Sequence, residues 1–73
     1  MNKNLAINSG DLRLWKMTGG KHILVLVLFA EMSDVTRMFT GWWWVLGDSG
    51  DGFKQYLVPS HSLHNLLQEK INL

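Results

Sequence analysis

Two small groups of residues have the side chains and spacing that a metal site requires. His61 and His64 lie three residues apart, and two imidazoles at this spacing can bind zinc where a third ligand converges on them. Asp48 and Asp51 could ligate calcium, but an EF-hand loop needs an acidic residue at its twelfth position, which counted from Asp48 is Pro59. The sequence identifies no third zinc ligand. We therefore expect surface histidines and solvated turn aspartates, with no bound metal and no cofactor.

The segment Gly47-Asp48-Ser49-Gly50 resembles the loop that carries the nucleophilic serine of trypsin-like serine proteases, over these four residues only. Those enzymes need two barrels to position a histidine, an aspartate and an oxyanion hole, which is far more chain than 73 residues. His22 is the only histidine upstream of the serine, and no aspartate stands beside it to orient it. The chain also lacks a glycine-rich phosphate loop and a plausible pair of catalytic carboxylates. We expect no enzymatic activity.

The basic residues are scattered along the chain rather than gathered into a stripe. Seven Lys and Arg stand against six Asp and Glu, which gives a net charge of +1. Proteins that neutralise several phosphates usually carry a basic cluster, so this distribution disfavours nucleic-acid binding.

The apolar run 23–30 is too short to span a bilayer, which needs about 20 residues. The charged residues Asp11, Arg13 and Lys16 precede this run, unlike the order in a signal peptide. The chain has no cysteine, which fits a reducing cytoplasm. We expect a soluble cytoplasmic protein without membrane contact, of the kind that bacteria and their phages use as small accessory proteins.

Four segments have the β-branched, aromatic and alternating apolar residues that are typical of strands, and turn signals separate them. The segments are 12–18, 21–31, 36–46 and 53–58. They predict an antiparallel β-meander over 11–58. Residues 1–10 would either add an edge strand or fray.

From Ser60 onward the apolar spacing changes from two to nearly four, which predicts an amphipathic C-terminal helix over 60–72. The whole chain, 1–73, is then one small α+β domain. An SH3-like half-barrel and a flat two-layer sheet both fit this order of elements. A single helix over 23–39 is the rival interpretation, and the valine content of that segment disfavours it.

The pair Gly19-Gly20 predicts a two-residue hairpin turn between the first two strands, because glycine readily adopts positive φ. Such a turn would pair Thr18 with Lys21, and directly paired residues share a face of the sheet. One face would carry Leu12, Leu14, Lys16, Ile23, Val25, Val27 and Phe29, and the other Arg13, Trp15, Met17, His22, Leu24, Leu26, Leu28 and Ala30. Both faces are mostly apolar.

This apolar excess is the strongest functional indication in the sequence. Strands that are apolar on both faces must be covered on both, and one short helix covers only one. If the side bearing Trp42 and Trp44 packs beneath the helix, the opposite face stays open. The residues expected to bind a partner there are Phe39, Trp43 and Val45, with Arg37 and Tyr56. We expect a non-catalytic protein-interaction module, an inhibitor, adaptor or small subunit, that forms a homodimer, binds a larger protein, or does both.

Binding of single-stranded nucleic acid is the alternative function. Aromatic side chains exposed on a sheet can stack on unpaired bases. In that interpretation Trp43, Phe39 and Tyr56 form the stacking platform, and Arg37 and Lys54 contact phosphates.

Overall fold

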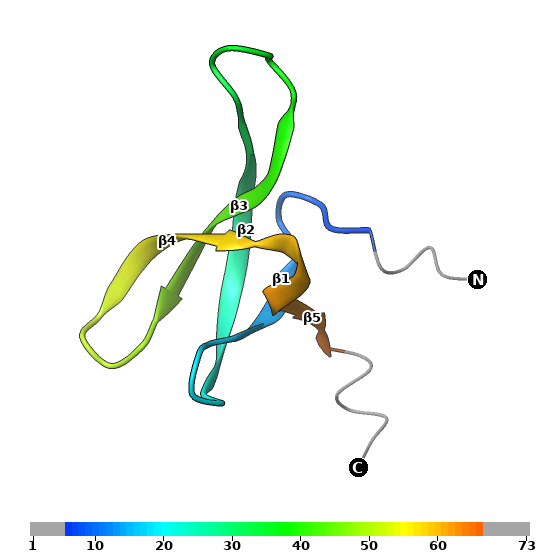
Figure 1. Cartoon of the computed structure of the whole chain (residues 1–73). Helices are drawn as coiled ribbons and strands as arrows, with labels where there is room; N and C mark the ends of the chain where they lie inside the picture. Colours follow the sequence, from blue (N-terminus) through cyan, green and yellow to red (C-terminus); the bar gives the residue numbers. More distant parts are fainter. Residues whose placement is uncertain (1–5, 67–73) are drawn as a thin grey trace.

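The computed structural model describes residues 6–66, which form a five-stranded antiparallel sheet (Figure 1). Its strands are β1 (Leu12–Lys16), β2 (His22–Met32), β3 (Phe39–Asp48), β4 (Phe53–Pro59) and β5 (Leu63–Asn65). The order across the sheet is β4-β3-β2-β1-β5, so β1 to β4 form a meander and β5 returns to pair with β1. The four strands predicted from the sequence are confirmed, and the rival helix over 23–39 is wrong.

The predicted α+β class with a C-terminal helix over 60–72 is not borne out by the described residues, which are mostly β with almost no helix. A 3-10 turn, η2 (Ser60–Ser62), follows β4, and β5 follows it directly. Leu63, whose spacing from the later leucines indicated a helix, instead pairs with Trp15 and is buried in the core. Positions 67–73 of the predicted helix lie outside the described residues.

The loop between β1 and β2 is one residue longer than the glycine pair indicated. The backbone N–H of Met17 donates to the carbonyl of Lys21 (2.7 Å), and the N–H of Gly20 donates to the carbonyl of Met17 (3.1 Å). Residues 18–20 therefore form the connection. Gly19 and Gly20 have φ of 94° and 90°, a region that other residues rarely adopt.

The longer loop changes the register of the first hairpin. Leu14 pairs with Leu24 and Trp15 pairs with Ile23, so the predicted pairing of Thr18 with Lys21 is wrong by one residue. A one-residue slip moves every side chain of one strand to the opposite face relative to its partner. The predicted division of residues between the two faces is wrong for the same reason.

The inner face of the sheet carries a core built largely of valine. Its buried members are Val25, Val27, Val45, Val58 and Leu63. The sheet curls around this core. The curl is shown by the rings of Trp15 on β1 and Tyr56 on β4, whose centroids lie 4.9 Å apart although β2 and β3 separate the two strands. The curl leaves a small interior, and the compact, conformationally restricted side chains of valine fill it.

Gly47 lies on this inner face, opposite Val25. A Cβ atom at this position would approach Val25 Cγ1 to 2.7 Å and Ile23 Cδ1 to 3.2 Å. The glycine is therefore required for the close approach of β3 to β2.

Arg13 is the buried charged residue of the described chain, with 6% of its surface exposed. Its guanidinium donates to the carbonyl of Ala6 (2.8 Å) and forms an ion pair with Asp11 (3.2 Å). The segment before β1 is neither an edge strand nor frayed from residue 6 onward, because these bonds hold it as a turn. Residues 1–5 lie outside the described chain.

The β2–β3 hairpin projects well beyond the rest of the sheet (Figure 1). Its ladder has a register shift between Val27 and Phe29 and another between Ala30 and Met32. The first shift reverses the facing of β2, so Val27 points into the core while Phe29 pairs with Trp44 on the outside. We call the projecting residues 31–40 the arm.

Candidate functional site

The outer face of the sheet is covered by large apolar side chains from four strands. Directly paired residues share a face, and most pairs here join leucine to leucine or aromatic to apolar residues, whereas Lys16 pairs with His22 and Gln55 pairs with Leu46 at the margins. We define the outer face as Leu12, Leu14, Leu24, Leu26, Phe29, Trp42, Trp44, Leu46 and Leu57. All nine are half-buried or exposed in the described structure, so neither β5 nor the arm covers this surface.

The exposed area of the outer face is large for a chain of this size. Leu12, Leu24, Phe29 and Trp42 are 54%, 52%, 53% and 41% exposed. At about 200 Å² for a fully exposed large side chain, these four alone present about 400 Å². The five half-buried members add to that area. Soluble monomers rarely expose contiguous apolar patches of more than a few hundred Å².

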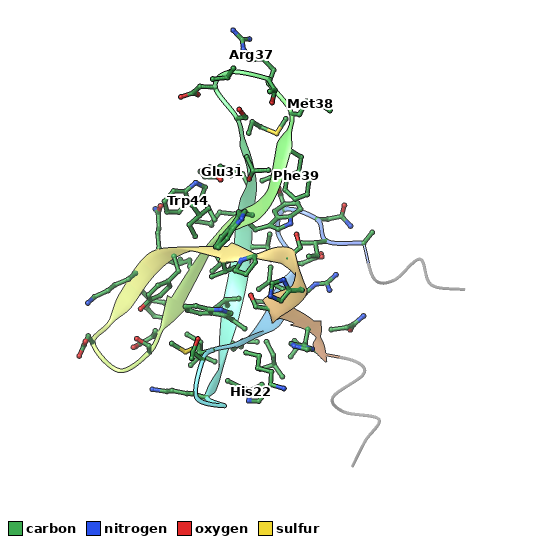
Figure 2. All side chains as sticks on the ribbon, in the orientation of Figure 1. His22, Glu31, Arg37, Met38, Phe39 and Trp44 are labelled. Atoms are coloured by element: carbon green, nitrogen blue, oxygen red, sulfur yellow. The ribbon has the colours of Figure 1, made fainter. Side chains whose placement is uncertain are left out.

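The arm carries a second set of exposed apolar side chains. Met32, Val35, Met38 and Phe39 are all exposed, Val35 by 89%. Ser33 fixes the tip, because its hydroxyl accepts from the N–H groups of Val35 and Thr36 and its carbonyl accepts from that of Arg37. Figure 2 shows Arg37 at the tip, with Met38 and Phe39 further down the arm.

Three of the five predicted partner-binding residues lie on the inner face. Val45 is fully buried, and Trp43 and Tyr56 pack against the core. Trp43 Nε1 donates to Ser60 Oγ (3.1 Å), which ties β3 to η2. The premise that Trp42 and Trp44 pack beneath a helix is wrong for the described chain, because the core lies on the opposite side of β3.

The other two predicted residues, Phe39 and Arg37, lie on the arm and are exposed. The centroids of the Phe39 and Trp43 rings lie 5.4 Å apart in an edge-on arrangement, so Phe39 extends the inner face of the sheet onto the arm. The structure thus separates the predicted set into a core group and an arm group. It places a different set, the leucine-rich outer face, on the open surface. A correct loop length for the first hairpin would have grouped Leu12 and Leu14 with Leu24 and Leu26.

A groove of about 390 Å³ lies at the rim of the curled sheet. We call it the edge groove, because its walls come from the end of β1, the end of β4, η2 and β5. Its lining residues are Trp15, Lys16, Met17, Thr18, Leu57, Val58, Pro59, His61, Ser62 and His64. The histidine pair singled out in the sequence therefore lines one groove together with Lys16.

The residues with possible chemistry are otherwise occupied by structural contacts. Ser49 Oγ lies 3.0 Å from Tyr56 Oη, and Asp48 Oδ1 accepts from the N–H groups of Gly50 and Gly52 within the β3–β4 turn. In the described residues no group of three or more His, Cys, Asp or Glu side chains could hold a metal ion. No helix in this part of the chain is long and apolar enough to cross a membrane.

Comparison of the chain with family models, curated proteins and solved structures finds no match in any of the three.

Proposed function

We propose that this protein is a non-catalytic protein-interaction module whose contact surface is the outer face of the sheet. The observation that supports this is the row of cross-strand apolar pairs on β1 to β4, among them Leu14 with Leu24 and Phe29 with Trp44. A sheet whose second face meets water normally alternates apolar residues with polar ones. On this sheet most positions of the second face are apolar and the polar ones lie at its margins, which supports a protein contact there.

The first partner we propose is a second copy of the chain. A standard interface buries about 800 Å² on each partner. The outer face, with about 400 Å² from its four most exposed members and further area from the rest, approaches that size. Two copies would meet face to face about a two-fold axis, so that each patch covers the other in the manner of a β-sandwich.

We also propose that the protein is cytoplasmic. Either the dimer or the monomer would bind a larger protein, as its inhibitor, adaptor or subunit. The proposal also includes an SH3-like half-barrel as the architecture. The curl that brings Trp15 to Tyr56, and the return of β5 to β1 after η2, support a half-barrel over a flat sheet.

Analytical ultracentrifugation over about 1–200 μM protein tests the homodimer. We expect a species of twice 8.4 kDa for the wild type and a monomer for Leu24→Glu, which places a charge on the outer face beside Leu14. Val35→Glu is the matched control, because it puts the same charge on the arm and should leave the dimer intact. A monomeric wild type at 200 μM, or a Leu24→Glu protein that still dimerises, would overturn the homodimer.

A further inference from the structure

We propose that the edge groove binds an extended acidic peptide segment that carries a large apolar side chain. This site goes beyond the proposed function, because it lies at the rim of the sheet and most of its lining residues are outside the outer face. It shares Leu57 with that face, and its residues His64 and Pro59 pair with Leu14 and Trp42. Its volume of about 390 Å³ falls in the ~300–1,000 Å³ range of ligand pockets. The groove accommodates a few side chains of an extended chain and is too small for a folded domain.

At pH 7 the charged residue of the groove lining is Lys16, and its charge is positive. The ionisable lining residues are Lys16, His61 and His64, and the remaining lining residues are apolar or neutral. In the described part of the chain these three side chains make no hydrogen bond or ion pair within the molecule. The five acidic residues that the structure describes lie elsewhere, at the start of β1, on the arm and in the β3–β4 turn. Carboxylates of a bound segment would therefore meet the Lys16 ammonium, which has no acidic partner among the described residues, and the two imidazoles beside it.

The apolar wall of the groove explains why the ligand should carry a large apolar side chain. Trp15, Met17, Leu57 and Pro59 offer ring, thioether and aliphatic surface to a bound group. Ser62 Oγ donates to the carbonyl of Pro59 (2.7 Å), which holds η2 against the end of β4. This part of the wall is therefore held in place without a ligand, which lowers the conformational entropy lost on binding.

The position of the groove favours an extended peptide over a compact anion. β4 ends the sheet on one side and β5 ends it on the other, and the groove is bordered by both. Edge strands offer backbone N–H and C=O groups to which an extended segment can align. A peptide along this edge would place alternate side chains toward the apolar wall and toward Lys16 and the histidines.

Titration of the full ¹⁵N-labelled chain with the amidated peptide acetyl-Glu-Leu-Asp-Phe-Glu tests the site by NMR. We expect saturable shifts confined to the amides of residues 15–18 and 57–64, and weaker binding as salt is raised. The same peptide with lysine at its acidic positions should not bind. Lys16→Glu combined with His61→Glu should weaken binding by about 5-fold or more, whereas Lys54→Glu, on β4 and outside the groove lining, should leave it unchanged.

Several results would overturn the site. These are no shifts at about 2 mM acidic peptide, equal binding of the lysine peptide, or shifts that map to the outer face. A hexathymidylate that binds the same amides more tightly than the acidic peptide would assign the groove to nucleic acid instead. Ultracentrifugation measures self-association independently of the NMR titration. A monomeric wild type would therefore not affect the test of the groove, and a groove that binds no peptide would not affect the test of the homodimer.

Discussion

Replacement of Val45 by alanine should destabilise the fold and leave partner binding intact. Val45 has 0% of its surface exposed and pairs with Val27 and Tyr56 on the inner face. The change removes two methyl groups, worth about 1.6 kcal/mol in transfer free energy at ~0.8 kcal/mol each. The vacated space of about 50 Å³ adds about 1 kcal/mol, because the core around it relaxes only in part. We expect a loss of about 2–3 kcal/mol.

That loss is a large part of the total stability of such a chain. At roughly 0.05–0.15 kcal/mol per residue, 73 residues give about 4–11 kcal/mol. In a domain of this size each kcal/mol shifts the melting temperature by about 4–8 °C, so thermal unfolding should occur about 10–20 °C lower. Urea denaturation at a fixed low protein concentration measures the same loss and limits any contribution from self-association.

Val35→Ala is the matched control for this experiment. It makes the same chemical change at a side chain that is 89% exposed on the arm, and it should alter the unfolding free energy by less than about 0.5 kcal/mol. If Val45→Ala melts with the wild type, and self-association or peptide binding weakens instead, then Val45 contacts a partner. The assignment of the inner face as the core would then be refuted.

Two further substitutions test the inner face and the segment before β1. Gly47→Ala should lower the free energy of unfolding, measured by urea denaturation, by about 1–3 kcal/mol, because the new methyl group overlaps Val25. The double variant with Val25→Ala should lose less than the sum of the two single losses. Additive losses would contradict this contact. Arg13→Ala should cost about 2 kcal/mol and speed hydrogen exchange at Gly10; unchanged exchange would show that another contact holds the segment.

The sequence alone predicted the strands well and the pairing between them poorly. Alternation, β-branched residues and turn glycines act over a few residues, and they located β2 and β4 to within one residue at each end. The register of the first hairpin depended on whether the loop held two or three residues. Both loops use the same Gly19-Gly20 pair, so the sequence did not distinguish them. An error of one residue there was enough to exchange the two faces.

The C-terminal error has a different cause. Leucines at 63, 66 and 67 have helical spacing, and no local signal indicates a strand of three residues. β5 forms because Leu63 fills the core beside Val58 and because β1 offers a free edge to pair with. That edge lies about fifty residues earlier in the chain, and periodicity within a short window contains no information about it. The candidate surfaces were missed in consequence, because both depend on β5 or on the register.

The distribution of apolar side chains across the sheet supports our proposal that a partner covers the outer face. The buried core on the curled inner face is small and consists of four valines and Leu63, with Trp15, Trp43 and Tyr56 packed against it. Six leucines and two of the three consecutive tryptophans lie on the convex side, where each has more apolar area to hide than a valine. A chain selected to stay alone would place polar residues there, as other half-exposed sheets do. Because these large apolar side chains lie on the outside, a second surface packed against them, as we propose, would add to the hydrophobic gain of folding.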